Sequence, residues 1–444
     1  MENKNKEIKN NLLVKLEKYF EFSKHKTNFK VEILAGLSTF MALSYIFVVN
    51  PAILGGAGFN VSAVLFASII TSFLSTLVMG LWAKKPFVLA PGMEMNAYVA
   101  FFVVIGLGYS SQQALGAVFW SGIIFMILTL SGIRTKIINS IPNNIKLGLS
   151  LCVGVFLMII ALRLSEILIY DGILFSGVGV FTSSLAYVFY LGLGLILLLK
   201  YFKVKGAVLI SIVASAIFAN YMGLGNTGNA IEFSTDMFSS IFTLDFSVIL
   251  DYKLWGVILV LFLVDFYGSV AKFIGLTRNT SIVDKDGKLP LMKETLSVDG
   301  YATLVGSVLG TTSLTTYVES GVGISEGGRT GFTAVVCSIL MLLFMLLAPL
   351  VNMVPVIATT GALFFVGISM FPSREELKYF TKFDILIIST MIITPIVTFT
   401  IDKALLFGFI LFILGCFFKK NFSEVNGYMY TSTLLLLVGL VLSF

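Results

Sequence analysis

Long runs of apolar residues alternate with short polar segments along almost the whole chain after residue 30. Fourteen runs are long enough, or nearly long enough, to cross a bilayer as helices. Several are short or interrupted by Gly and Pro, as expected of helices that break at membrane depth. We place them at residues 31–50, 61–81, 87–107, 113–132, 145–162, 177–199, 206–222, 253–276, 297–310, 314–331, 332–352, 359–371, 384–399 and 403–418. The pattern predicts an all-α polytopic membrane protein with fourteen transmembrane segments.

Polar or shorter segments flank these runs at both ends. Residues 1–30 form a lysine-rich tail with an amphipathic pattern of Leu12, Leu13, Leu16, Tyr19 and Phe20, which we expect to lie on the membrane surface. The tail has no apolar core of the kind that a cleavable signal peptide needs. The C-terminal segment 419–444 ends in an apolar stretch, 430–444, that is too short to assign as a further span.

The distribution of basic residues agrees with fourteen transmembrane segments. With the N-terminus in the cytosol, the outside receives only Arg163, Lys253 and Lys403 after the first span, and the long loop 223–252 has no basic residue. This bias follows the positive-inside rule. We therefore expect a multi-pass protein of the plasma membrane with both terminal regions in the cytosol. Topology explains the net charge of +6, so no nucleic-acid partner is expected.

Composition excludes several kinds of site. Charged residues are 12% of the chain, about half the fraction of a soluble protein, and 57% of residues are hydrophobic. The three cysteines all lie in apolar segments, and His25, the single histidine, lies in the tail. We expect no disulfide framework, no metal site, no resident cofactor and no enzyme active site built on His or Cys.

An internal repeat relates the two halves. Residues 142–154 (PNNIKLGLSLCVG) and 355–367 (PVIATTGALFFVG) share Pro at the first position, Gly at the seventh and Val-Gly at the end. On the predicted topology the first block enters from the cytosol and the second from outside. The sequence thus predicts two inverted halves of seven spans each, an arrangement typical of secondary transporters.

Polar residues interrupt two apolar segments at corresponding depths. The stretch 311–329 (TTSLTTYVESGVGISEGGR) carries Glu319, although a charge at the bilayer centre costs at least about 2.5–3.5 kcal/mol. In the third span, Pro91-Gly92 predicts a short extended piece followed by a half-helix from about Met93, with Glu94 and Asn96 on its first turn. Glu94 is either a substrate ligand or a carboxylate that caps this half-helix.

The eighth span contributes Asp265 near mid-membrane and Lys272 two turns further along. Asp265 is either a site residue or one end of a structural bridge to Lys272 or Arg329, and we favour the site. Glu326 and Arg329 are expected at the cytosolic interface.

We expect no cation at the centre of this pocket, which argues against an anion as cargo. Carboxylates and an asparagine favour a ligand with several N–H donors, such as a nucleobase, or a cation. Tyr45, Phe40, Phe266, Tyr267 and Tyr317 lie within reach for stacking on a planar base. A channel would need a continuous polar lining, whereas here the polar groups gather at one depth.

Four stretches together carry a resemblance to a known family. They are GLSTFMALSYIFVVNPAIL, LAPGMEMNAYVAF, FLVDFYGSV and TTYVESGVGISEGGRTGFTAVV, in this order between about residues 30 and 420. The chain resembles the purine-permease (AzgA-like) branch of the nucleobase–cation symporter superfamily. The resemblance implies a core domain (31–133 and 253–352), a gate domain (145–222 and 359–418) and short strands in spans 3 and 10. It also implies proton-coupled uptake of adenine, guanine or hypoxanthine.

Asn96, Asp265 and Glu319 match the family's binding residues. Glu94, Met95 and Tyr317 complete the set of substrate-binding candidates. Asp265, Glu319 and Glu94 are the candidates for the coupling proton, and Na⁺ is the alternative coupling ion. The expected partners are a purine-type substrate, the lipid bilayer and, as an option, a second copy of the chain.

Two positions depart from the family pattern. The third span of the family reads Gly-Met-Gly-x-Asn-Ala, where this chain has Glu94 in place of the second Gly, and the second Asp of the eighth span is Gly268 here. We hypothesise that recognition is altered, toward another nitrogenous heterocycle or a cation. An anion transporter of the sulfate-permease type is the weaker alternative.

Overall fold

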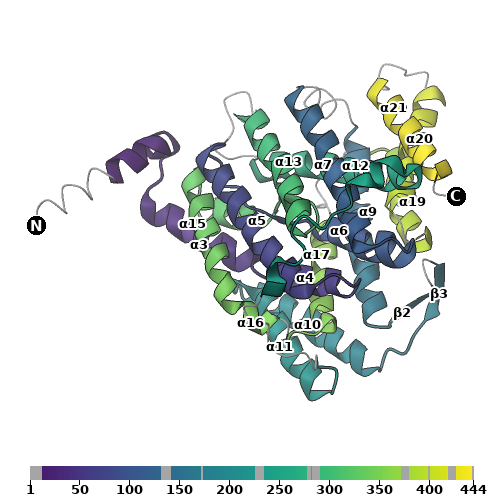
Figure 1. The fold of residues 1–444 in the computed structure, drawn as a ribbon, viewed down its shortest axis with the longest axis horizontal. Coiled ribbons are helices and arrows are strands. Elements are labelled where there is room, and N and C mark those ends of the chain that lie inside the picture. The colour runs from purple at the N-terminus through teal and green to yellow at the C-terminus, as the bar shows by residue number, and fades with distance from the viewer. Residues whose placement is uncertain are drawn as a thin grey trace, which may run out of the picture.

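The structure is a computed structural model, and almost all of its regular elements are helices (Figure 1). The residues it describes are 13–131, 142–171, 174–225, 235–277, 282, 291–351, 353–371, 380–398, 401–418 and 427–442. Among the described helices, 6 are long and apolar enough by themselves to cross a membrane. Five further apolar helices among the described residues are shorter, at 10–17 residues, and several of the predicted spans are assembled from two or three pieces.

The first half of the chain runs from the tail to the long loop. Its elements are α2 (Phe22–His25), α3 (Phe29–Leu43), α4 (Ile46–Gly55), α5 (Val61–Leu81), β1 (Leu89–Pro91), α6 (Met93–Ala97), the π-helix η1 (Tyr98–Gly106), α7 (Ser111–Leu130), α9 (Asn143–Leu164), β2 (Leu168–Asp171), β3 (Leu174–Val178), α10 (Ser184–Tyr201) and α11 (Ala207–Tyr221).

The second half begins with short 3₁₀ turns in the loop. Its elements are η2 (Thr235–Phe238), η3 (Phe246–Leu250), η4 (Tyr252–Leu254), α12 (Trp255–Thr277), α13 (Met292–Leu309), β4 (Leu314–Thr316), α14 (Ser320–Ser325), α15 (Gly331–Leu343), η5 (Phe344–Leu347), α16 (Ala348–Val351), η6 (Val356–Thr359), α17 (Thr360–Ser369), α19 (Lys382–Thr398), α20 (Asp402–Phe418) and α21 (Gly427–Leu442). The last of these helices covers much of the C-terminal stretch that was too short to assign as a span.

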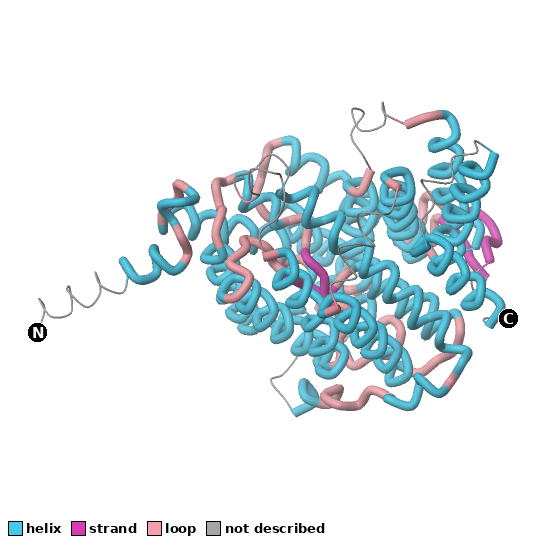
Figure 2. The backbone as a smooth tube through the Cα atoms, turned by 90° about the horizontal axis from the view of Figure 1, so that it is seen from above, coloured by secondary structure: helices cyan, strands magenta, loops and turns pink. Residues whose placement is uncertain are grey.

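Strands β1 and β4 lie side by side near the centre of the protein, surrounded by helices (Figure 2). They pair antiparallel, with Leu89 opposite Thr316 and Pro91 opposite Leu314. All six strand residues are buried. Because backbone groups at membrane depth need partners inside the protein, this pairing satisfies two segments that cannot continue as helices. Pro91 breaks the third span, and Gly310, at φ 105°, ends α13 before β4.

The repeated blocks occupy equivalent places and touch each other. Pro142 is the N-cap of α9 and Pro355 the N-cap of η6, with nearly the same backbone angles. A Cβ atom on Gly154 would lie 2.7 Å from the carbonyl oxygen of Gly367, and one on Gly367 would lie 2.5 Å from that of Gly154. Each glycine therefore permits the other's helix to approach, as small residues do between membrane helices.

Helix α15 packs against both α3 and α5, and helix α9 packs against both α17 and α19. A buried carboxylate joins the first group. Glu32 of α3 is fully buried, and its Oε1 accepts from the backbone N–H of Arg329 (3.0 Å). Its Oε2 accepts from the N–H groups of Thr330 (3.4 Å) and Thr333 (3.2 Å) and from the Thr333 hydroxyl. Glu32 thus caps the start of α15 from a neighbouring helix.

The tail packs on the protein as well as being amphipathic. The Tyr19 hydroxyl donates to the carbonyl of Leu81 (2.6 Å), and the buried Phe20 ring lies 5.4 Å from that of Phe332. Phe22 also contacts Phe332. Leu12 lies outside the described residues. The buried rings of Phe20 and Phe22 therefore pack against the start of α15, and the expected position of the tail on the membrane surface stays a prediction.

Candidate functional site

The two interrupted spans each end their strand at the start of a short helix. Helix α6 begins at Met93, where the half-helix was expected, with Gly92 as its N-cap, and α14 begins at Ser320 with Glu319 as its N-cap. Gly92 has no side chain to cap α6, and the Glu319 side chain forms no capping hydrogen bond to α14. The first backbone N–H groups of a helix lack intrahelical partners. Both helices therefore begin with polar backbone groups next to the β1–β4 strand pair.

Glu319 is held on one side only. The hydroxyl of the buried Tyr45, from the turn between α3 and α4, donates to Glu319 Oε1 at 2.7 Å. Glu319 Oε2 is buried and has no hydrogen-bond partner among the described residues. A buried carboxylate oxygen without a donor is costly unless something else supplies one. This oxygen is therefore the clearest position for a ligand N–H or a proton.

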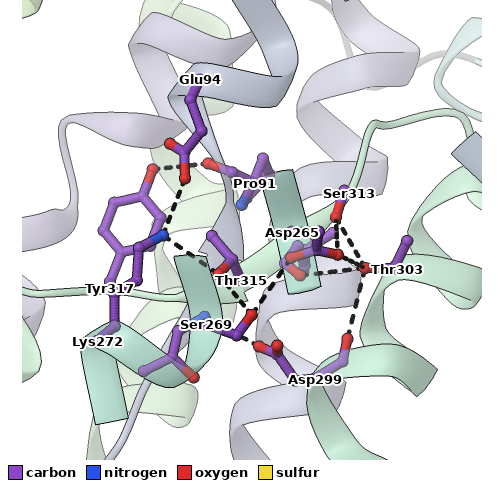
Figure 3. Close-up of polar contacts among 12 residues, drawn as sticks. Pro91, Glu94, Asp265, Ser269, Lys272, Asp299, Thr303, Ser313, Thr315 and Tyr317 are labelled. Carbon is purple, nitrogen blue, oxygen red and sulfur yellow. Dashed lines mark hydrogen bonds and ion pairs between the residues drawn. The ribbon is translucent and has the colours of Figure 1, made fainter. Parts of the chain in front are cut away.

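Lys272 lies in the site and forms an ion pair with Glu94 (Figure 3). Its Nζ is 2.9 Å from Glu94 Oε1 and also donates to the hydroxyl of Thr315 on β4 at 3.2 Å. The two side chains are only 15% and 14% exposed. The expectation of a pocket without a central cation was wrong. Helix α12 directs Lys272 across to the start of α6, which no spacing within α12 reveals.

Asp265 is surrounded by hydroxyl groups (Figure 3). Its carboxylate accepts from Ser313 (2.7 Å), Thr303 (3.2 Å) and Ser269 (3.3 Å), and the residue is 5% exposed. These donors come from the segment before β4, from α13 and from α12 itself. These hydrogen bonds join α12 to α13 and to the segment that leads into β4. These hydroxyl contacts account for the burial of Asp265 without a bridge to Arg329, and its role as a site residue stays a prediction.

The remaining candidate site residues pack around the β1–β4 strand pair. Asn96 is fully buried, its Oδ1 accepts from the Thr312 hydroxyl, and its Nδ2 has no partner in the described part of the chain. The Tyr317 hydroxyl donates to the carbonyl of Pro91 at 2.6 Å and so ties the end of β4 to β1. Met95 is 2% exposed. Gly268 lies in α12, but its surroundings fall outside the described residues.

Sequence reasoning missed two roles. Lys272 was considered only as a bridge to Asp265, and Tyr45 only as a stacking ring. Lys272 is seven residues, or two turns, after Asp265, so it shares a helix face with it. That periodicity was the available signal that Lys272 points inward. For Tyr45 the sequence gives no comparable signal, because its partner is 274 residues away.

Comparisons with known proteins agree on one family. The profile of the Permease family (Xan_ur_permease) matches residues 30–404. The chain is 38% identical to the putative permease MJ0326 of Methanocaldococcus jannaschii, over 94% of this chain and 95% of that protein. It is 35% identical to the adenine permease AdeP of Escherichia coli (82% of each chain). Identity to the guanine/hypoxanthine permease PbuO of Bacillus subtilis is 34%, over 88% of this chain and 92% of that one.

A solved structure shares the fold at low identity. The transmembrane domain of the cyanobacterial bicarbonate transporter BicA superposes with a TM-score of 0.65 at 15% identity, over 85% of this chain and 96% of that one. This likeness supports an inverted-repeat transporter fold. The matches confirm the resemblance seen in the sequence: the chain belongs to the permease family of integral membrane transport proteins, beside the purine permeases of the nucleobase–cation symporter superfamily, and is not an enzyme.

Proposed function

We propose that this protein is a secondary active transporter that takes up a purine nucleobase across the plasma membrane, coupled to H⁺. The observation that carries the proposal is the carboxylate of Glu319. It lies at the start of α14, it is oriented by Tyr45, and its second oxygen has no donor among the described residues. A purine supplies N–H donors of the kind that this oxygen lacks.

Glu319 is also the best candidate for the coupling proton. Glu94 is neutralised by Lys272, and Asp265 already accepts from three hydroxyl groups. A desolvated carboxylate without a cation in hydrogen-bond contact favours its protonated form, so protonation of Glu319 would compensate for its burial. Na⁺ as the coupling ion remains the alternative to test.

The architecture proposed for transport has fourteen spans in two inverted halves. The core domain (31–133 and 253–352) would carry the site and move against the gate domain (145–222 and 359–418) to alternate access. Two polar contacts of a single lysine join the proposed domains near the predicted cytosolic side. Lys205, just before α11, donates to Ser38 of α3 (2.9 Å) and pairs with Glu326 after α14 (2.9 Å). Both termini would be cytosolic, and the assembly would be a monomer or a homodimer.

Lys272 gives one alternative a specific observation in its favour. A buried ammonium close to the start of a half-helix can attract an anion, which would favour a transporter of the sulfate-permease type. Its pairing with Glu94 at 2.9 Å weakens this alternative, because the positive charge is already compensated. A different nitrogenous heterocycle is the other alternative, since Glu94 departs from the family pattern.

Uptake into proteoliposomes tests the proposal. Radiolabelled adenine or hypoxanthine should accumulate under an inward proton gradient, and the accumulation should collapse when an uncoupler is added. The Glu319→Gln variant should bind purine weakly and lose the response to the gradient, whereas Glu17→Gln, in the exposed part of the tail, should behave like the parent protein. Uptake of sulfate or bicarbonate, with no uptake of purines, would overturn the proposal.

A further inference from the structure

The ammonium of Lys272 has one donor to spare. A lysine ammonium carries three N–H donors, and two are used here, toward Glu94 Oε1 (2.9 Å) and the Thr315 hydroxyl (3.2 Å). The side chain is 15% exposed, so the ammonium is neither sealed in the core nor freely hydrated. No third partner is present among the described residues. A ligand atom that accepts a hydrogen bond can therefore complete its coordination.

The spare donor and the spare acceptor belong to one site. Figure 3 shows the Tyr317 ring beside Glu94 and Lys272, and Glu319 follows Tyr317 by two residues at the start of α14. Tyr317 is itself fixed to the carbonyl of Pro91. These side chains therefore gather around the β1–β4 strand pair. The oxygen of Glu319 that has no donor within the described segments lies at the start of α14, and the ammonium of Lys272 extends from α12.

Glu94 fixes where the ammonium points. It lies on the first turn of α6, and Thr315 lies on β4, so Lys272 is held between the two interrupted spans. A lysine on a flexible four-carbon stem would otherwise lose side-chain entropy whenever a ligand bound. Pairing with Glu94 removes that cost in advance, which is the usual way in which a binding site is preorganised.

Purines differ in what they would present to such a donor. A 6-oxopurine offers two neighbouring acceptors, O6 and N7, whereas adenine offers N7 beside an N6 amine that is itself a donor. Lysine is one of the side chains that contact the O6/N7 edge in nucleic-acid recognition. A single ammonium donor placed at position 6 would bond to O6 of a 6-oxopurine, whereas in adenine it would meet the N6 amine donor and stay unsatisfied.

We propose that Lys272, oriented by Glu94, selects 6-oxopurines such as hypoxanthine and guanine over adenine. This inference rests on the proposed function and narrows its substrate class. Lys272 would donate to the O6/N7 edge, while Glu319 would accept from an N–H group of the same base. Known relatives of the chain include both adenine and guanine/hypoxanthine permeases, so their names leave this choice open.

Binding measurements on the purified full-length protein test the inference. Titration calorimetry with hypoxanthine and with adenine should give a preference for hypoxanthine of about tenfold or more, the scale expected for one hydrogen bond from a charged donor. Since removing Lys272 alone leaves Glu94 buried and unpaired, the informative variant is the double change Lys272→Met with Glu94→Gln. It should lose the preference and keep or increase its affinity for adenine.

Two further variants separate recognition from structure. Lys272→Arg retains a donor and should keep part of the preference for hypoxanthine. Lys253→Met removes an exposed lysine from the turn before α12 and should leave both affinities unchanged. If the double variant weakens both purines equally, or if the parent protein prefers adenine, the inference is wrong. If the folded parent protein binds no purine at all, the proposed function fails instead.

Discussion

Replacing Glu32 should destabilise the protein strongly, because one buried carboxylate serves three backbone N–H groups and a hydroxyl. The contacts run from Glu32 in α3 to Arg329, Thr330 and Thr333 at the start of α15, at 3.0, 3.4 and 3.2 Å for the N–H donors. A hydrogen bond to a charged group contributes about 1.5–3 kcal/mol, and a buried N–H left without a partner costs about 1–3 kcal/mol. Such terms are not additive, so we expect Glu32→Ala to cost about 4 kcal/mol.

Glu32→Gln should cost about half as much, near 2 kcal/mol, because the amide keeps the shape and one acceptor oxygen. The NH₂ group of the amide would face an N–H donor, and the favourable charge at the helix start would be lost. The measurement is equilibrium unfolding of the detergent-solubilised protein in denaturant. Glu17→Ala, which removes an exposed carboxylate from the tail, is the matched control. Equal unfolding midpoints for Glu32→Ala and this control would refute the reasoning.

Three further predictions follow from other features. Burial lowers the pKa of Lys85, in the loop after α5, from 10.5 to about 8, so the free energy of unfolding should rise with pH between about 8 and 10.5. Lys85→Met should abolish that rise and add roughly 3 kcal/mol to the free energy of unfolding at pH 7, as measured by unfolding across this pH range. Gly154→Ala should cost about 1–3 kcal/mol of stability, because the new Cβ would meet Gly367 of α17. Gly194→Ala, whose Cβ would point into open space, should be neutral or stabilising. Unchanged unfolding of Gly154→Ala would contradict the close approach of α9 and α17. Tyr45→Phe should weaken purine binding about tenfold in calorimetry, since Glu319 loses the donor that orients it, and unchanged affinity would show that this bond is dispensable.

Local features of the fold could be predicted because they depend on neighbouring residues. Pro91-Gly92 indicates the break in the third span, and the short helix begins at Met93 as expected. The repeated Pro and Gly positions indicated equivalent places in the two halves. Gly154 and Gly367 do lie against each other. In each case the physical cause, a missing N–H or a missing Cβ, can be read from one residue.

The partners of the buried charges could not be predicted in this way. Lys272 and Glu94 are 178 residues apart, and Glu32 and Arg329 are 297 apart. Periodicity shows that a side chain points inward, but the element it meets depends on how the helices pack. Glu32 was overlooked altogether, because a carboxylate in the first turn of a helix is ordinarily solvated or caps its own helix.

The pairing of β1 with β4 also constrains how the protein is made. Leu89 pairs with Thr316, so β1 leaves the ribosome more than 200 residues before its partner exists. At about 5–20 residues per second this interval lasts roughly 10–45 s. During that time the first half has backbone groups at membrane depth that only the second half can satisfy. The two halves therefore cannot mature independently, and a chain truncated before β4 should be recognised as unfinished and degraded.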